Sequence, residues 1–295
     1  MRIVILGAGA GGGLPQWNCG CTQCSAARRG LIAPMTQSTL AVSVDGSTWA
    51  LLNASPDLRQ QLATWPALHP TSLRGSPVKA VVLTNGDVDH IAGLLTLREK
   101  TGFTLYATDA THQVLSENTV FGVLDPVLVR RETVFLDHPF SPLPGLMVTA
   151  YAVPGKTPLY LEGETPELEA MGEQTVGLRL QAGGREAHYV PGCAALPDWL
   201  VDHLSQAAVV LFDGTVWSDD DMPLSGTGAK TGVRMGHVAM RGPAGSLARL
   251  GPLQGRRIYT HVNNTNPALM PDSEARATIM AAGWEIANDG MEIVL

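Results

Sequence analysis

The sequence predicts an α/β protein in which two mixed β-sheets pack face to face with helices on their outer surfaces, an αββα sandwich. Two observations predict this fold class. Short apolar segments rich in Val, Leu and Ile recur between turn signals, and segments with apolar residues at helical spacing lie between some of them. The apolar segments cluster in pairs, which favours two mixed sheets over a regular alternation of strand and helix. The 295 residues are interpreted as a single domain, 1–295.

The predicted strands are the short apolar segments bounded by Gly, Pro, Asn or Asp. In chain order they are 3–6, 40–44, 49–53, 80–83, 104–107, 146–153, 176–180, 188–190, 208–212, 258–260 and 291–295. The predicted helices are 57–64, 91–100, 111–117, 197–204, 244–250 and 273–282. The loop 218–235 contains three consecutive Asp and several Gly, and is the candidate for an active-site flap.

Charge and hydropathy exclude several classes of protein. Twenty Lys and Arg against 27 Asp and Glu give a formal net charge of −7, which argues against nucleic acid as a partner and favours a small substrate. No apolar run approaches the roughly 18 residues of a membrane span, and the first residues resemble a strand rather than a signal peptide. We therefore expect no membrane insertion and a cytoplasmic location. Whether the chain forms a homodimer is left open.

A glycine-rich turn follows the first strand. Gly7-Ala8-Gly9-Ala10-Gly11-Gly12 matches the pattern of a dinucleotide-binding loop. That site also needs a helix directly after the glycines and an acid about 20 residues further on, whereas Pro15 and a cysteine cluster follow and the first acid is Asp45. The pattern is better explained by backbone that passes close to a functional site.

Three of the four cysteines are clustered in the segment Cys19-Gly20-Cys21-Thr22-Gln23-Cys24. This spacing allows three thiolates to converge on one tetrahedral ion, with a fourth ligand from elsewhere, so we expect a structural Zn²⁺. Three free thiols on a loop are the alternative. Cys193 is distant in sequence and is interpreted as a small buried residue.

The segment with the most chemistry is Thr84-Asn85-Gly86-Asp87-Val88-Asp89-His90, which follows a buried strand. Polar groups at the carboxyl end of a strand lie where α/β proteins form their sites. Two carboxylates and one imidazole make a plausible half of a metal site, and a helix N-cap at Asp87 or Asp89 is the structural alternative.

This segment resembles the H-x-H-x-D-H motif of the metallo-β-lactamase superfamily, with Asn85 and Asp87 in place of the leading histidines and with Asp89 and His90 retained. Further landmarks of that superfamily follow in order: Lys156 replaces a ligand histidine, Gly192 stands near the bridging aspartate, and His261 matches the final histidine. Asp213 and His237 occupy positions where the phosphodiesterase branch has an acid and a histidine that work together. The resemblance implies a metallo-β-lactamase-like fold.

A closer resemblance, over essentially the whole chain, is to the pyrroloquinoline quinone (PQQ) biosynthesis protein B family. It is carried by the segment that begins at Gly11, by 53–61, by 84–93 and by Thr260-His261-Val262-Asn263-Asn264-Thr265-Asn266-Pro267. It implies a substrate derived from cross-linked glutamate and tyrosine, whose ring must gain oxygen. Other proteins of the PQQ pathway are implied as partners.

The resemblance implies one active-site metal held by Asp89, His90 and His261. Two histidines and one carboxylate are the ligand set of non-haem Fe(II) oxygenases, although Zn²⁺ binds the same ligands. We therefore expect Fe²⁺- and O₂-dependent hydroxylation of the tyrosine ring. Asp213 and His237 are the candidates for proton transfer, with an ordinary loop histidine as the alternative for His237.

Two further residues have expected roles at this site. Asp87 is a candidate additional ligand, and Lys156 is expected to pair with Asp87 or with a substrate carboxylate. Related phosphodiesterases supply the fourth ligand of the zinc site three residues after the last active-site histidine, and here that position is Asn264. Arg59, Arg234 and Arg241 are candidates for binding substrate carboxylates.

Two other functions compete with hydroxylation. The first is a carrier without enzymatic activity that moves PQQ or its precursor toward the periplasm. The second is a metal-dependent hydrolase, which the replaced ligands at Asn85, Asp87 and Lys156 disfavour.

Overall fold

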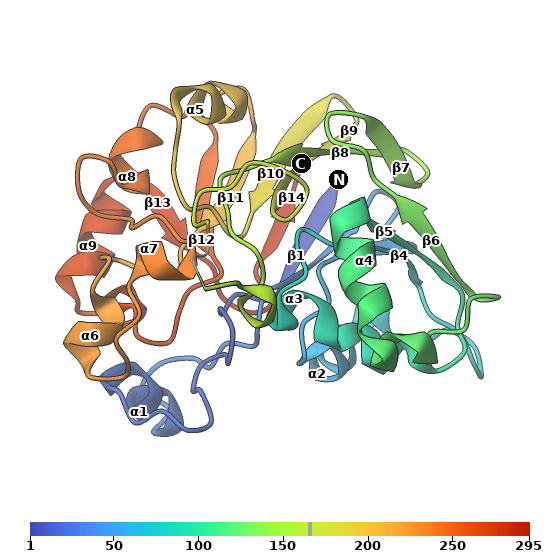
Figure 1. Ribbon diagram of the computed structural model, residues 1–295, viewed down its shortest axis with the longest axis horizontal. Coiled ribbons are helices and arrows are strands. Elements are labelled where there is room, and N and C mark those ends of the chain that lie inside the picture. The colour runs from blue at the N-terminus through green and yellow to red at the C-terminus, as the bar shows by residue number, and fades with distance from the viewer. Residues whose placement is uncertain (165–166) are drawn as a thin grey trace.

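A computed structural model of the chain describes residues 1–164 and 167–295. It contains two seven-stranded sheets that pack against each other, with helices on both outer faces (Figure 1). The predicted αββα sandwich is confirmed.

The first sheet has the strand order β14-β1-β2-β3-β4-β5-β6. Its β14, β1, β2 and β3 are antiparallel neighbours, and β3 to β6 run parallel. The bounds of its strands are β1 Arg2–Gly7, β2 Thr39–Ser43, β3 Trp49–Leu52, β4 Val78–Val82, β5 Phe103–Ala107, β6 Val129–Thr133 and β14 Glu292–Val294.

The second sheet has the order β13-β12-β11-β10-β9-β8-β7. Strands β7 to β10 are antiparallel neighbours, and β10 to β13 run parallel. Their bounds are β7 Pro139–Leu143, β8 Leu146–Ala152, β9 Val176–Ala182, β10 Arg185–Val190, β11 Val209–Asp213, β12 Arg256–Thr260 and β13 Trp284–Ile286.

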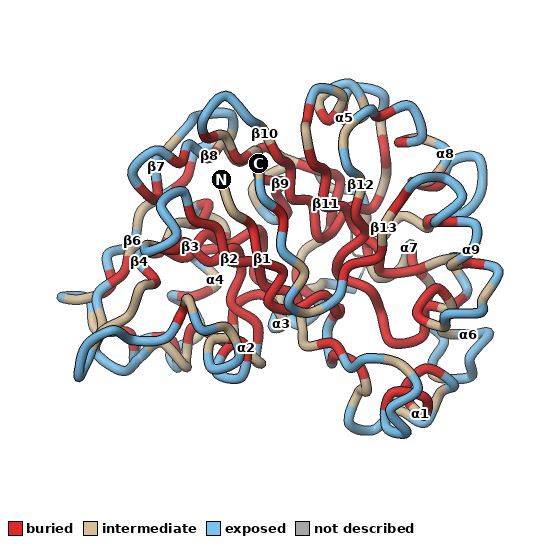
Figure 2. The backbone as a smooth tube through the Cα atoms, turned by 180° about the vertical axis from the view of Figure 1, so that it is seen from behind, coloured by how far each residue is buried: buried red, intermediate tan, exposed pale blue. Residues whose placement is uncertain are grey.

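Alternation along the strands explains the layers. In β1, Ile3 and Ile5 belong to the core that both sheets share, whereas Val4 and Leu6 belong to a second cluster beneath the helices of the first sheet. Both layers are buried, as the tube in Figure 2 shows along the strands. This two-sided burial is the reason that the strands appear as nearly continuous apolar runs.

Helices cover each outer face. The first sheet is covered by α2 Leu58–Thr64, α3 Val88–Ile91 and α4 Asp109–Glu117, and the second by α5 Asp198–Leu204, α8 Ser246–Arg249 and α9 Glu274–Ala281. The helices α1 Thr22–Arg28, α6 Asp221–Ser225 and α7 Gly232–Met235 lie at one end. The 3₁₀ helices are η1 Pro66–Leu68, η2 Ala92–Arg98, η3 Thr119–Val123, η4 Leu159–Leu161 and η5 Pro267–Leu269. Within residues 1–164 and 167–295, no helix combines the length and the apolar composition of a membrane span.

Several elements differ from the prediction. Strands β6, β7 and β13 were not predicted, because β6 carries three consecutive charged residues, β7 contains two prolines and β13 is short. The predicted helix 91–100 is instead α3 followed by η2, and α8 is shorter than the predicted 244–250. The predicted flap 218–235 contains α6 and α7.

The outer face of the second sheet contains a buried polar cluster under α5. His188 Nδ1 lies 2.8 Å from the hydroxyl of Tyr151, and its Nε2 lies 3.0 Å from Glu186 Oε1. The ring of His203, from α5, packs edge-on against Tyr151 at a centroid distance of 4.4 Å. Burial lowers the pKa of His188 to about 4, so the folded protein keeps this imidazole neutral at pH 7.

We predict that His188 makes the protein less stable as pH falls from about 6.5 to about 4. In that window the unfolded chain binds a proton at His188 and the folded chain does not, so acid favours unfolding. Urea unfolding at stepped pH should show a shallower decline for His188→Gln, by up to about 1.4 kcal/mol per pH unit. The exposed His69→Gln serves as the control. Equal slopes for the parent protein and His188→Gln would contradict this account.

Candidate metal centre

The carboxyl ends of β4, β11 and β12 meet at one end of the sandwich, next to the loop that follows β1. They surround a cavity of about 260 Å³. The residues that line it include Gly11, Asp87, Asp89, His90, Lys156, Gly192, Thr215, Lys230, Arg234, His237 and His261. Parallel neighbouring strands bring their carboxyl ends to the same edge, so residues far apart in the sequence converge here.

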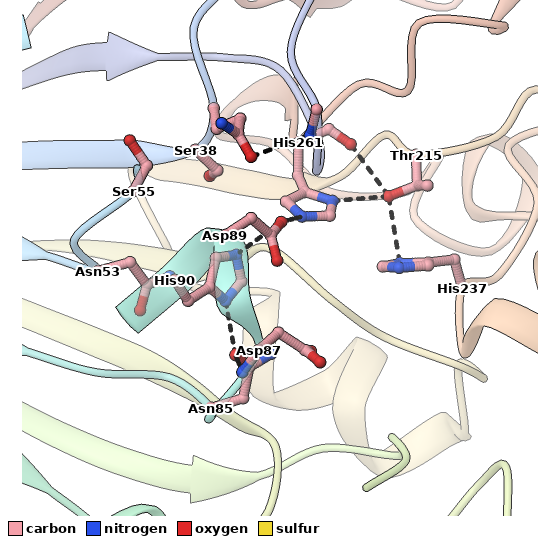
Figure 3. Close-up of polar contacts among 12 residues, drawn as sticks. Ser38, Asn53, Ser55, Asn85, Asp87, Asp89, His90, Thr215, His237 and His261 are labelled. Atoms are coloured by element: carbon pink, nitrogen blue, oxygen red, sulfur yellow. Dashed lines mark hydrogen bonds and ion pairs between the residues drawn. The ribbon is translucent and has the colours of Figure 1, made fainter. Parts of the chain in front are cut away.

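Asp89, His90 and His261 converge on one point of this cavity (Figure 3). His261 Nε2 lies 3.0 Å and His90 Nε2 lies 3.9 Å from Asp89 Oδ2. His90 Nε2 is buried and has no hydrogen-bond partner within the described part of the chain. A buried nitrogen without a partner is costly unless it binds something, so this donor set fits a metal ion.

Hydrogen bonds to the far side of each ring fix both imidazoles. His90 Nδ1 donates to Asn85 Oδ1 at 2.7 Å. His261 Nδ1 donates to Thr215 Oγ1 at 2.8 Å, and that hydroxyl in turn donates to Asp213 Oδ1 at 2.7 Å. With Nδ1 protonated on both rings, His90 Nε2 carries a lone pair, and loss of the proton that His261 Nε2 shares with Asp89 would direct a second lone pair to the same point, as in metal-binding histidines.

Burial and charge set the ionisation of the three groups. Burial acts to raise the pKa of Asp89, but the electrostatic influence of His90 and the hydrogen bond from His261 outweigh it and hold the pKa below its usual range. Burial lowers the pKa of His90 to about 4. Burial also opposes the charged form of His261, yet the bond to Asp89 raises the pKa of this imidazole. An ionised carboxylate and a neutral His90 are the forms that bind a cation.

Asp213 and His237 form a pair beside this centre. His237 Nδ1 donates to Asp213 Oδ2 at 2.7 Å, and the same oxygen accepts the backbone N–H of Cys193 at 2.9 Å. Burial acts to raise the pKa of Asp213, but His237 reverses the effect and the pKa is lowered. His237 also stacks on His261 at a centroid distance of 5.3 Å. Its other nitrogen, Nε2, remains for contacts with groups in the cavity, which His237 lines.

Gly192 stands at the strand end where the superfamily resemblance placed a bridging aspartate. A Cβ at this position would lie 3.7 Å from His237 Cε1. No carboxylate projects from here toward the three converging ligands, and the ring of His237 borders the space instead.

Asp87 lines the cavity as the residue that precedes α3, and it lies outside the three-ligand group found among the described residues. Burial, assisted by the neighbouring Asp89, raises the pKa of Asp87 to about 6. The predicted partner of Lys156 was Asp87 or a substrate. In the structure, Lys156 Nζ binds Glu162 Oε1 at 2.8 Å.

The glycine-rich turn after β1 supports the segment that bears His261. Val262 N donates to Ala8 O at 2.9 Å, and Ala10 N donates to Val262 O at 3.0 Å. These bonds help to hold His261 in the left-handed region, at φ 56°, which is uncommon for a residue with a side chain. A Cβ on Gly11 would lie 3.5 Å from the Asp89 carboxyl group, so this turn passes close to the site.

The cysteine cluster lies around the side chain of Asn264. Cys19, Cys21 and Cys24 bring their sulfur atoms together, and Asn264 Nδ2 lies 3.2, 3.7 and 3.3 Å from them. Rotation of the amide by 180° would place Oδ1 at this point. Asn264 therefore lies next to the three sulfur atoms, and its role as fourth ligand stays a prediction, while Cys193 is buried in the core.

Sequence reasoning missed two residues of the site. Thr215 connects Asp213, His237 and His261 through one hydroxyl, and Glu162 binds Lys156. Thr215 comes two residues after an acid at a strand end, which is a signal that could have been used. Glu162 had no such signal, since it lies in a loop without a recognisable pattern. Of the three arginine candidates, only Arg234 lines the cavity.

The chain is similar to known proteins over its full length. Residues 48–262 match the model of the β-lactamase superfamily domain. The chain is 56% identical to coenzyme PQQ synthesis protein B of Ruegeria pomeroyi, with all of both chains covered, and 55% identical to the protein of that name from Rhizobium meliloti, which it covers to 98%.

A solved structure agrees. The crystal structure of Zn²⁺-bound PqqB from Methylobacterium extorquens has a TM-score of 0.98 with this chain at 52% identity, and both chains are covered completely. A diphosphatase of the PhnP family, at 20% identity and a TM-score of 0.69, shares the fold. The chain belongs to the coenzyme PQQ synthesis protein B family, within the β-lactamase superfamily.

Proposed function

We propose that this protein uses one Fe²⁺ ion and O₂ to hydroxylate the tyrosine ring of a Glu-Tyr derived PQQ precursor in the cytoplasm. The observation that supports it best is the convergence of Asp89, His90 and His261, with His90 Nε2 buried and without a partner in the described chain. Two imidazoles and one carboxylate leave several coordination positions for substrate and O₂.

Bound at these three residues, Fe²⁺ would supply the redox chemistry that activates O₂. The overall reaction replaces a ring hydrogen by a hydroxyl group. One oxygen atom enters the ring and the other leaves as water, so two electrons and two protons must come from a reductant.

The chain's own residues position the reaction and handle its protons. Thr215 and Asn85 keep both metal-facing imidazoles in one orientation, which reduces the reorganisation needed for binding. His237, oriented by Asp213, faces the cavity with Nε2 and can exchange a proton with bound substrate. Asp213 and His261 are buried, so these two groups are themselves shielded from bulk water.

We further propose that Cys19, Cys21, Cys24 and the Asn264 side chain hold a structural Zn²⁺. Three sulfur atoms and an amide that lies within 3.7 Å of each of them support a closed four-coordinate site. Asn264 and His261 belong to one short segment, so the two metal sites are mechanically linked.

The hydroxylation is tested by anaerobic loading with Fe²⁺ or Zn²⁺, followed by addition of O₂, a reductant and a cross-linked Glu-Tyr substrate. Mass spectrometry should detect a gain of one oxygen atom in the substrate treated with the Fe²⁺-loaded protein, and no gain with the Zn²⁺-loaded protein. His90→Ala, which removes a metal-facing nitrogen, should abolish the gain, and the exposed His138→Ala should retain it.

Two other results would contradict the proposal. Tight binding of PQQ without any iron-dependent turnover would favour a carrier. Hydrolysis of a simple ester that requires His261 would favour a hydrolase.

Asn85 provides a test of the imidazole orientation. Asn85→Ala removes the acceptor for His90 Nδ1 and should weaken metal affinity about 10- to 100-fold, as measured by competition with a chelating dye. Asn85→Asp, which keeps an acceptor oxygen, should restore most of the affinity, and the exposed Asn288→Ala should not alter it. An unchanged affinity in Asn85→Ala would show that this hydrogen bond has no role in metal binding.

The zinc site is tested by Cys21→Ser, which should lose bound zinc, lower the melting temperature and reduce turnover through the segment that joins Asn264 to His261. Cys193→Ala, at a buried cysteine outside the cluster, should retain zinc. Metal analysis, thermal unfolding and turnover, measured on the same samples, show whether zinc is lost and whether its loss affects the active site. Full turnover in zinc-free Cys21→Ser would refute the link between the two sites.

A further inference from the structure

Three cationic side chains line the same cavity as the metal-facing residues. They are Lys156, Lys230 and Arg234. Lys230 makes no ion pair among the residues that the structure describes. A group of cations next to a reaction site is suited to anionic groups of a ligand.

The carboxylate of Glu162 forms ion pairs with two of these three cations. Glu162 Oε1 lies 2.8 Å from Lys156 Nζ, while Arg234 donates through Nη1 to Oε1 at 3.1 Å and through Nη2 to Oε2 at 2.6 Å. The Glu162 side chain is only 5% exposed. The carboxylate is therefore held by a bidentate guanidinium and an ammonium group together, the arrangement by which proteins bind ligand carboxylates.

The site for this carboxylate is built by the surrounding backbone. Gly236, at φ +83°, ends α7, and a Cβ there would come within 3.0 Å of Lys156 Cγ and 3.1 Å of Cδ. The missing side chain thus makes room for the lysine stem beside Arg234.

The segment 156–162, which we call the strap, lines the cavity with Lys156 and Leu159 and ends at Glu162. Tyr160 at its centre donates to Gly86 O at 2.6 Å, in the loop that also bears Asn85 and Asp87. In Figure 1 the yellow-green strap lies between α3 and α7, consistent with its contacts to both sides. It consists of one 3₁₀ turn and loop, and no strand pairing of residues 157–162 holds it.

We infer that Lys156 and Arg234 form a carboxylate-binding site for the substrate, and that Glu162 is an internal occupant which a substrate carboxylate displaces when the strap moves. The inference deepens the proposed function by naming the group that is recognised, a carboxylate of a polycarboxylate ligand. Exchange of one carboxylate for another keeps both the mostly buried Lys156 and the partly exposed Arg234 in an ion pair. Lys230 is available for a second carboxylate.

The experiment measures binding to the Zn²⁺-loaded protein by calorimetry, without O₂ chemistry. The probes are citrate, as a simple tricarboxylate, and the dipeptide glutamyl-tyrosine with its dimethyl ester. Glu162→Gln keeps the size of the occupant and removes its charge, so both carboxylate probes should bind about tenfold more tightly than to the parent protein. Lys156→Met and Arg234→Gln should bind them about tenfold more weakly. The ester should bind all variants alike.

Glu285→Gln is the matched control, because Glu285 forms an ion pair with Arg256 away from the cavity, and it should leave binding unchanged. Melting temperatures establish that each variant folds. Citrate binding to Glu162→Gln that is equal to or weaker than that of the parent protein would overturn the inference and leave Glu162 as a structural ion-pair partner. Tighter citrate binding without dipeptide binding or hydroxylation would support the carboxylate site and count against the proposed function.

Discussion

The hydroxyl group of Thr215 joins the parts of the site that come from different strands. It donates to Asp213 at the end of β11, accepts from His261 Nδ1 after β12, and lies 3.1 Å from His237 Nδ1. This single group fixes the tautomer of His261 and ties it to the pair Asp213 and His237. The left-handed backbone of His261, supported by the glycine-rich turn after β1, then directs Nε2 toward Asp89.

The replacements relative to the superfamily pattern have physical consequences that agree with one another. Asn85 accepts a hydrogen bond from His90. The residue at a position that is a ligand histidine in the superfamily motif therefore orients a neighbouring ligand. Gly192 contributes no bridging carboxylate, and Lys156 brings a positive charge to the cavity wall. A nearby cation disfavours a second metal ion by Coulomb repulsion. The same charge becomes useful for an anionic substrate, and Glu162 balances it in the structure described here.

Much of the fold was predictable from the sequence, because strands buried on both faces form uninterrupted apolar runs such as Ile3 to Leu6. Polar strands such as β6 and β7 were missed, since their pairing and not their composition makes them strands. The convergence of Asp89, His90 and His261 was expected from a resemblance, and the geometry brings them together. The contacts of Thr215 and Glu162 depend on loops whose paths no local pattern encodes. The partner of Lys156 could not be predicted for the same reason.

Our proposal for the site is one metal ion held by Asp89, His90 and His261. Anomalous diffraction at the iron absorption edge, from crystals grown and loaded with Fe²⁺ without oxygen, tests it most directly. We expect a single active-site peak at about 2.0–2.2 Å from His90 Nε2, His261 Nε2 and an oxygen of Asp89. A peak held instead by Asp213 and His237, or two adjacent peaks, would contradict it.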